Sequence, residues 1–335
     1  MQIKNILYLA IIVSITGILF IGASDLNKNN KHIQKKQAIH LCKAIKYNQI
    51  DKIQKLLKQG ADLNIPNKSG WLPLTKAASL NHIKITKFLL LNGADINQQD
   101  NGGYTALIWA IQKGHNQMIK LLLSNGANPN IVNEYFGFSP LIYTVYNNNL
   151  QMAELLLQHK ANISHQDHTG LTALDIAAHY GSVPMLKLLF SNAANLKTSN
   201  NWGNSPLTIA AENNHLQAVE FLLQHGSNVN HQDVAIDPYL IVRNGFTALM
   251  YASLNGNIEM VKLLLRNNAN INLHDKYGQT ALHQAVIMDH PEIVKELLSH
   301  GANLDIKDVN GATALELAQN SKNQKIIDLL QQKQT

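Results

Sequence analysis

The apolar positions of the chain recur with a period close to 33 residues over most of its 335 residues. Each period contains the string Gly-x-Thr/Ser-Ala/Pro-Leu, and a second string, Leu-Leu-x-x-Gly-Ala-x-x-Asn, keeps step with it. The leucines that end the first string are Leu74, Leu107, Leu141, Leu174, Leu207, Leu249, Leu282 and Leu315. Their spacings are 33, 34, 33, 33, 42, 33 and 33, so one period holds one extra residue and another holds nine. Such self-similarity predicts an array of stacked structural repeats.

Each period predicts a first helix that begins next to the shared leucine. A hydroxyl side chain stands where it can accept a hydrogen bond from the free amides of a starting helix, and in several periods a proline occupies the first helical position. The hydroxyls are those of Thr105, Ser139, Thr172, Ser205, Thr247, Thr280 and Thr313. Leu72 replaces the hydroxyl in one period, so we expect a weaker helix start there.

A second helix follows in each period, with apolar residues at helical spacing, as in residues 258–265. It ends where a glycine can adopt the left-handed backbone conformation that terminates a helix. The terminating glycines are Gly60, Gly93, Gly126, Gly226 and Gly301. Asn268 can replace glycine at this position, whereas we expect Lys160 and Ala193 to be strained or to end their helices differently.

An uncharged apolar run covers residues 6–23 and ends in Gly-Ala-Ser, where a signal peptidase could cut. The run is long for the core of a signal peptide and short for a membrane-spanning helix. Four lysines within residues 28–36 favour retention on the cytoplasmic side. We therefore expect residues 1–24 to form one apolar helix, either a membrane anchor or a cleaved signal peptide, followed by a basic linker at 25–35. A buried helix of a soluble protein is the third alternative.

The two strings resemble the ankyrin repeat, a unit of 33 residues with the signature Thr-Pro-Leu-His-x-Ala. Residues 280–285, Thr-Ala-Leu-His-Gln-Ala, match this signature best. In other periods another residue replaces the histidine. The hydrogen bonds that the histidine makes in the family therefore cannot be carried over to those periods. The replacing residues are Ile108, Ile142, Asp175, Thr208, Met250 and Glu316. The resemblance implies an all-α fold, an α-solenoid of helix-turn-helix units with β-hairpin fingers, here preceded by the N-terminal apolar helix.

The resemblance covers residues 36–335 in about nine units. We expect these units at about 36–67, 68–100, 101–133, 134–167, 168–200, 201–242, 243–275, 276–308 and 309–335. Because each unit packs only on its neighbours, the two end units need polar outer faces. The lysine-rich residues 36–60 and the polar residues of 322–332 provide such caps.

The resemblance also implies where a partner protein binds. In the family, the fingertips and the exposed side of the first helices form a concave binding face. Eleven of the chain's 20 aromatic residues lie at or beside the corresponding positions or in the nine-residue insertion at 234–242. The candidate binding residues are Trp71, Tyr104, Phe136, Phe138, Tyr146, Tyr180, Trp202, Tyr239, Phe246 and Tyr277, with Tyr135 beside them. Exposed aromatic residues often dominate interface energy, although each of these could instead pack on the next finger. The insertion, likewise, either contacts a partner or packs on its own solenoid.

The net charge of +6 does not indicate nucleic-acid binding. Residues 25–60 hold nine lysines against two aspartates, whereas the chain from residue 61 onward has 18 basic and 20 acidic residues. A nearly neutral repeat body lacks the clustered basic face that neutralises phosphates.

No constellation of catalytic, cofactor-binding or metal-binding residues stands out. Cys42 is the single cysteine, and we expect it in the core. Histidines at one shared repeat position lie two units apart, roughly 20 Å if helices pack about 10 Å apart, whereas zinc needs ligands at about 2 Å. Recurring aspartates precede the turn glycines, where their side chains are expected to bond turn amides. They are Asp100, Asp167, Asp275 and Asp308.

We therefore expect a non-catalytic scaffold or adaptor that binds another protein, without cofactor, metal or small-molecule substrate, and that is membrane-anchored by its N-terminal helix. The main alternative is a bacterial-type ankyrin protein that is periplasmic or secreted after signal cleavage. A membrane-tethered spacer and an enzyme hidden in a repeat scaffold are the remaining alternatives.

Overall fold

The computed structural model describes residues 33–234 and 244–334, which fall into two units, Met1–Tyr135 (unit 1) and Phe136–Thr335 (unit 2). The apolar segment at 1–24 and the basic linker lie outside the described residues except for 33–35, so the anchor or signal peptide stays a prediction. Tyr239 and all of the insertion except Val234 also lie outside them. Within the described ranges, no helix combines the length and apolarity needed to cross a membrane.

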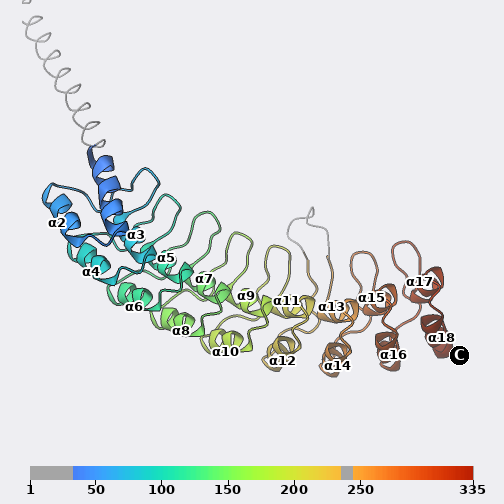
Figure 1. Ribbon diagram of the computed structural model, residues 1–335. Helices are drawn as coiled ribbons and strands as arrows, with labels where there is room; N and C mark the ends of the chain where they lie inside the picture. Colours follow the sequence, from blue (N-terminus) through green and yellow to red (C-terminus); the bar gives the residue numbers. More distant parts are fainter. Residues whose placement is uncertain (1–32, 235–243, 335) are drawn as a thin grey trace, which may run out of the picture. The chain divides into compact units, whose positions relative to one another are not determined.

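Helices of two lengths alternate along both units (Figure 1). After a helical segment at 33–46, the first helices have seven residues each: α3 (Pro73–Ser79), α5 (Ala106–Gln112), α7 (Pro140–Tyr146), α9 (Ala173–His179), α11 (Pro206–Glu212), α13 (Ala248–Leu254), α15 (Ala281–Ile287) and α17 (Ala314–Asn320). The second helices have nine residues, or 11 in the last: α2 (Ile50–Lys58), α4 (Ile83–Leu91), α6 (Asn116–Ser124), α8 (Leu150–Gln158), α10 (Val183–Ser191), α12 (Leu216–Gln224), α14 (Ile258–Arg266), α16 (Pro291–Ser299) and α18 (Gln324–Gln334).

The helices of each unit pack in two rows. In unit 1, α3 packs on α5 and α4 on α6, and each first helix also packs on the second helix that follows it. In unit 2, the first helices α7, α9, α11, α13, α15 and α17 form one row, and the second helices from α8 to α18 form the other. Loops project from the row of first helices as fingers (Figure 1).

The shared leucines form the core between the rows. Seven of the eight are at most 3% exposed, because each lies between its own second helix and the neighbouring first helices. Leu315 is half-buried, since α17 is the last first helix of its row. Burying a leucine contributes about 1.5–3 kcal/mol, so the repeated leucines are a principal source of stability in each unit.

The predicted helix starts are confirmed. Hydroxyl oxygens of the predicted residues accept hydrogen bonds from the backbone amide three residues later in six of the seven cases: Thr105, Ser139, Thr172, Ser205, Thr247 and Thr313. The Thr280 hydroxyl instead lies 2.9 Å from Nδ1 of His283. At Leu72 the side chain makes no capping bond, and the Thr75 hydroxyl oxygen accepts from the Leu72 amide at 3.1 Å.

The predicted helix ends are also confirmed. The five predicted glycines have φ between 81° and 89°, and Asn268 has φ of 62° in the same left-handed region. Lys160 and Ala193 adopt φ of 65° and 67°, so both side chains occupy a backbone conformation that costs an ordinary residue energy. The helix geometry is therefore kept at these two sites at the expense of local strain.

The histidine position of the repeat is filled in more than one way. Nδ1 of His283 accepts from the Thr280 amide at 3.2 Å, and carboxylates perform the same task for Thr172 and Thr313. Asp175 accepts from the Thr172 amide at 2.8 Å and Glu316 from the Thr313 amide at 2.6 Å. An acidic side chain thus replaces the histidine as acceptor.

The fingers are turns rather than strands in the described residues. Strand-like pairing in the described residues is limited to isolated bridges, such as the antiparallel pairs His274 with Thr280 and Lys307 with Thr313 and the bridge positions at Asn133 and Phe138. The predicted β-hairpins are therefore reduced to hairpin-shaped loops. The predicted aspartates hold these loops, because each Oδ1 accepts from the amides two and four residues later at 2.8–3.1 Å. The prediction that they bond turn amides is confirmed for Asp100, Asp167, Asp275 and Asp308.

Candidate protein-binding face

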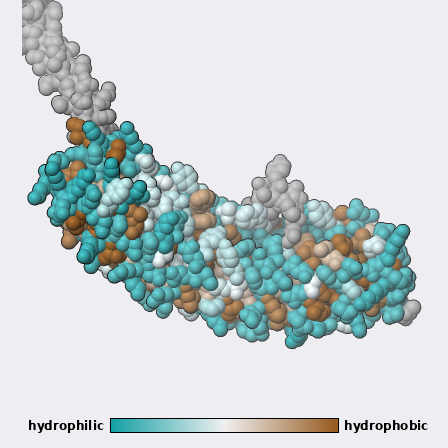
Figure 2. All heavy atoms as spheres, viewed as in Figure 1, coloured by the Kyte–Doolittle hydropathy of each residue, from teal (hydrophilic) through white to brown (hydrophobic). Residues whose placement is uncertain are grey.

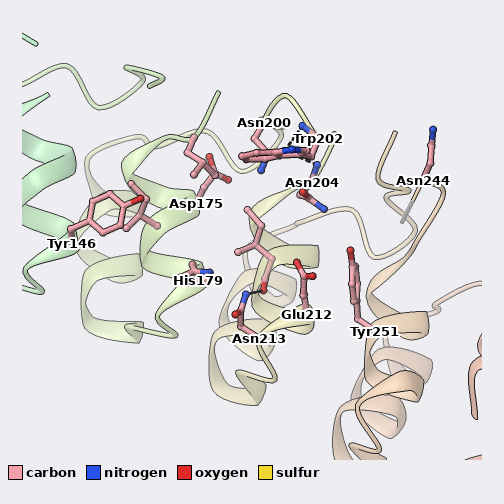
Figure 3. Close-up of a pocket in the computed structure, with 13 residues that line it drawn as sticks. Tyr146, Asp175, His179, Asn200, Trp202, Asn204, Glu212, Asn213, Asn244 and Tyr251 are labelled. Atoms are coloured by element: carbon pink, nitrogen blue, oxygen red, sulfur yellow. Dashed lines mark hydrogen bonds between the residues drawn. The ribbon is translucent and has the colours of Figure 1, made fainter. Parts of the chain in front are cut away.

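A pocket of about 600 Å³ opens in unit 2 between the fingers and the row of first helices (Figure 3). The fingers contribute Leu171, Asn200, Trp202, Asn204 and Asn244 to its lining. The first helices α7, α9, α11 and α13 contribute Tyr146, Asp175, Ile176, His179, Ile209, Glu212, Asn213 and Tyr251. Residues from four successive repeats therefore meet at one hollow.

The repeat geometry explains why these side chains converge. Tyr146, His179 and Glu212 each lie five residues after a shared leucine and end α7, α9 and α11. Because the helices of the row are equivalent, the three side chains follow one another along the side that faces the pocket. We call the side of unit 2 formed by these three residues and the neighbouring fingers the finger face.

Asp175 supplies a buried charge at the wall of the pocket. Its Oδ2 accepts from the Thr172 amide at 2.8 Å and from the Thr172 hydroxyl at 2.7 Å. Its Oδ1 is buried without a hydrogen-bond partner. Burial raises the pKa of this carboxyl to about 6 against the lowering effect of the Thr172 bonds, and nearby Asp167 raises it further.

Asp233 is a second buried carboxyl, and it connects the finger to two helices. Its Oδ1 accepts from the Thr208 hydroxyl at 2.7 Å, and its Oδ2 accepts from Asn204 Nδ2 at 2.6 Å and from the Tyr251 hydroxyl at 3.0 Å. Burial raises its pKa to about 7 even though these bonds favour the ionised form. Asn204 and Tyr251, which line the pocket, are thus fixed by a common acceptor.

Four of the candidate aromatic residues form a ladder that leads to the pocket. Ring centroids of Phe136 and Phe138 are 5.4 Å apart, those of Phe138 and Tyr146 5.3 Å, and those of Tyr146 and Tyr180 6.0 Å. Phe136 and Tyr180 are 52% and 51% exposed. Tyr146 belongs to both the ladder and the pocket, so the two features form one surface on the finger face.

Unit 1 holds a separate aromatic cluster. Trp109 lies between Trp71 and Tyr104, with ring centroids 4.6 Å and 4.9 Å away. Its indole Nε1 donates to Oδ2 of Asp100 at 2.7 Å. The ammonium of Lys76 sits 4.2 Å from the centre of the Trp71 ring. The candidates Trp71 and Tyr104 therefore pack within their own unit, and both are half-buried.

Three further candidates, Trp202, Tyr277 and Tyr135, have exposed side chains. Trp202 is 39% exposed and lines the pocket opposite Tyr146, as Figure 3 shows. Tyr277 is 43% exposed, and the Lys276 ammonium lies 4.6 Å from its ring centre. Tyr135 is 68% exposed.

Phe246 is not a surface residue. It is only 5% exposed, and its ring centroid lies 5.0 Å from that of buried Tyr251. It follows its turn glycine directly, so its side chain turns inward beside α13 instead of projecting from the fingertip. We exclude Phe246 from the proposed binding surface for this reason.

Sequence analysis missed three aromatic residues at one repeat position. Trp109, Tyr143 and Tyr251 each lie two residues after a shared leucine. Each packs on the aromatic residue that directly follows its turn glycine: Trp109 contacts Trp71, the Tyr143 ring centroid lies 5.3 Å from that of Phe138, and Tyr251 contacts Phe246. Their common spacing from the leucine was a signal that could have identified them.

The single cysteine of the chain is buried in unit 1. Cys42 is 5% exposed, and burial raises the pKa of its thiol to about 12, so the prediction that it is a core residue is confirmed. The described part of the chain contains no cluster of three or more His, Cys, Asp or Glu residues that could hold a metal ion. On the side shown in Figure 2, apolar residues reach the surface in separate groups among hydrophilic ones.

Comparisons with known proteins agree with the repeat pattern. A family model described as ankyrin repeats (3 copies) matches residues 13–100, 41–133, 87–167, 107–200, 141–233, 191–275 and 249–335. Among solved structures, the ankyrin repeat domain of Bcl-3, described as a unique member of the IkappaB protein family, is similar with a TM-score of 0.59 and 26% identity, over 69% of this chain and 100% of that one. No curated protein matches.

Ankyrin repeat proteins are generally non-enzymatic scaffolds, and both similarities support a role in protein–protein interaction. The chain therefore belongs to the ankyrin repeat family.

Proposed function

We propose that the chain is a scaffold or adaptor that binds a segment of a partner protein on the finger face of unit 2. The observation that carries this proposal is the pocket between Tyr146 and Trp202, two aromatic residues from different repeats that line one hollow. Aromatic residues that remain partly exposed around a pocket are typical anchors of protein interfaces. The ladder from Phe136 to Tyr180 extends this surface beyond the pocket.

The finger that carries Trp202 is held rigidly. The Trp202 amide donates to Asn200 Oδ1 at 3.0 Å, and the Asn201 amide donates to the Thr169 carbonyl of the preceding finger at 3.0 Å. Gly203 has φ of 79°, and a β-carbon there would clash with the backbone of Val234. A preorganised finger loses little conformational entropy on binding, so its exposed ring can contribute directly to affinity.

A site-specific photo-crosslinker tests the proposal. We expect a crosslinking amino acid at position 202 of the full-length chain, expressed in its source cells, to capture a defined protein, and the same group at exposed Gln224 to capture none. Gln224 ends α12 in the row of second helices, away from the pocket lining, which makes it a matched control.

The captured protein is then purified and its affinity measured directly. Trp202→Ala should weaken binding about 30-fold or more, because interface anchors contribute 2 kcal/mol or more. Leu91→Ala, at an 86% exposed position of unit 1, should leave binding unchanged. Equal crosslinking from positions 202 and 224, or unchanged affinity in Trp202→Ala, would reject the finger face as the binding surface.

A further inference from the structure

Seven exposed lysines gather at the start of unit 1, on the helical segment at 33–46 and on α2. They are Lys35, Lys36, Lys43, Lys46, Lys52, Lys55 and Lys58. Residues 33–60 contain one acidic side chain, that of Asp51. No salt bridge joins any of the seven lysines to a carboxylate among the described residues, whereas Lys325 of unit 2 lies 3.1 Å from Glu292. The helical segment and α2 therefore carry a positive charge that is not neutralised, and we call them the basic end of unit 1.

Lys52 shows that the basic end is a side of unit 1 that no other repeat covers. Its position is apolar in every later period and at most 1% exposed there, being occupied by Ile85, Met118, Met152, Met185, Ala218, Met260, Ile293 and Ile326. Ile326 is buried although no repeat follows α18 in the described residues, so the cover at this position comes from the repeat before. No repeat precedes α2 in the described part of the chain, and Lys52 is exposed. A charged residue thus stands where the later repeats bury an apolar one.

Hydrogen bonds join the two parts of the basic end. Gln34 Nε2 donates to the Gly60 carbonyl at 3.0 Å, and Gln37 Nε2 donates to the Gln59 carbonyl at 3.1 Å. The start of the helical segment therefore lies beside the end of α2 (Figure 1). A folded support keeps the lysines of both parts concentrated in one place, which strengthens the potential that they create.

The distribution of charge favours an anionic partner for unit 1 alone. Residues 33–135 hold 13 lysines against five carboxylates, whereas residues 136–335 hold 12 basic side chains against 16 acidic ones. A second copy of the chain would bring the same positive charge to the basic end and be repelled. The partner of this end is therefore an anionic surface and not another basic end.

The neighbouring sequence selects a membrane as that surface. The uncharged apolar run at 6–23 ends nine residues before residue 33, and a chain of nine residues spans at most about 32 Å. A run inserted in a bilayer would keep the basic end within that distance of the headgroups, whereas it would bring no nucleic acid closer. Tyr47, which is 56% exposed beside Lys46, has the apolar body and polar tip that suit a membrane interface.

We propose that the basic end of unit 1 lies on a membrane surface that contains anionic phospholipids, with its lysines among the headgroup phosphates. Clusters of about four to eight basic residues beside an apolar membrane segment bind such lipids, and each lysine near the surface strengthens binding about fivefold. Seven lysines on one folded support fit this pattern. The inference does not depend on the finger face, which belongs to unit 2 and stays available to a partner protein.

Energy transfer to labelled lipid measures this contact in the full-length chain. A donor dye is attached through an azido amino acid at exposed Gln54 of α2, and the chain is reconstituted into vesicles with an acceptor dye on their headgroups. The vesicles contain phosphatidylcholine alone or with about 30% phosphatidylglycerol, an anionic lipid. The apolar run is present with both kinds of vesicle, so its own effect cancels. We expect phosphatidylglycerol to raise the transfer efficiency about twofold at about 0.1 M salt, and about 0.5 M salt to remove this gain by screening.

Charge variants of α2 locate the contact. One variant combines Lys52→Gln, Lys55→Gln and Lys58→Gln, and it should shift the equilibrium about 100-fold from the attached to the detached basic end, which removes the gain in transfer. A second variant replaces the same three lysines by arginine and should keep the gain, because the charge is kept. All three side chains are exposed, and circular dichroism verifies that the repeats of each variant remain folded.

The matched control removes the same charge from exposed positions of unit 2. It combines Lys187→Gln, Lys197→Gln and Lys295→Gln and should keep the full gain. Three results would overturn the inference: equal transfer with the two kinds of vesicle, an unchanged gain in the glutamine variant of α2, or an equal loss of gain in the control.

A DNA duplex tests the other class of polyanion. We expect the duplex, added in place of vesicles, to bind the full-length chain and the glutamine variant of α2 alike. If that variant loses affinity for the duplex but keeps its gain on phosphatidylglycerol vesicles, the basic end is a nucleic-acid site and the membrane proposal is wrong.

Discussion

The aromatic cluster of unit 1 and the aromatic pocket of unit 2 are built on the same repeat but differ in what covers them. In unit 1, Trp71 packs on Trp109, and Lys76 places its ammonium 4.2 Å from the Trp71 ring. In unit 2, Trp202 and Tyr146 line a pocket of about 600 Å³. The rings of unit 1 pack closely on one another, whereas the two rings of unit 2 lie on either side of a hollow.

Similar positions of a repeat array can therefore have separate roles. The buried leucines are shared by both units, so one kind of core supports two different surfaces. The packing around each aromatic residue decides whether it stabilises its own unit, as Trp109 does, or stays partly exposed, as Trp202 does. Measurements on these two tryptophans test the difference.

The largest expected effect is on the stability of unit 1. Trp109→Ala removes two ring contacts and the hydrogen bond to Asp100, so we expect a loss of about 3 kcal/mol in the free energy of unfolding. Trp202→Ala in unit 2 should cost less than about 1 kcal/mol, because this ring is 39% exposed. Equilibrium urea unfolding of the two variants compares them. Similar losses of unfolding free energy in the two variants would contradict the distinction between Trp109, which stabilises its unit, and the partly exposed Trp202.

The second largest expected effect is on the pH dependence of stability, through the buried carboxyl of Asp175 in unit 2. Burial raises the pKa of Asp175 from its ordinary value of 3.8 to about 6, so the folded chain holds this proton more tightly than the unfolded chain. The free energy of unfolding therefore loses a contribution as the pH rises from about 4 to 6, and the full cost is present above that window.

Asp175→Asn removes this titration while keeping a side-chain oxygen for the Thr172 amide. Relative to the unchanged chain, the variant should gain stability on the order of 2 kcal/mol between pH 4 and pH 7. Asp308→Asn is the opposite control, because backbone amides lower the pKa of that carboxyl below its ordinary value of 3.8. Its contribution to stability is fully present above about pH 4, so its removal should cost a constant amount of stability between pH 4 and pH 7. A pH-independent difference between Asp175→Asn and the unchanged chain would contradict the assigned burial.

Much of the fold follows from the sequence because it depends on local rules. The capping hydroxyls, the terminating glycines and the shared leucines act within a few residues of their own position, so Thr105 or Gly93 could be assigned without knowledge of the neighbours. The same local logic correctly marked Lys160 and Ala193 as strained, since both adopt a left-handed backbone. The turn aspartates belong to this class as well.

The site is less predictable because it depends on contacts between repeats. Trp202 and Tyr146 were candidates from repeat position alone, and the structure places both at one pocket. Phe246 occupied a similar position but turns inward against Tyr251, which only the packing of α13 decides. The orphaned oxygen of Asp175 is likewise invisible in a sequence, because it results from burial that several repeats create together.

The sharpest measurement is the affinity of the partner captured from position 202 for two variants of the chain, Trp202→Ala in unit 2 and Leu91→Ala at an exposed position of unit 1. We expect binding to be about 30-fold weaker or more in Trp202→Ala and unchanged in Leu91→Ala, because the Trp202 ring lines the pocket and Leu91 lies outside the finger face. Equal affinity of the two variants would contradict a binding surface on the finger face of unit 2.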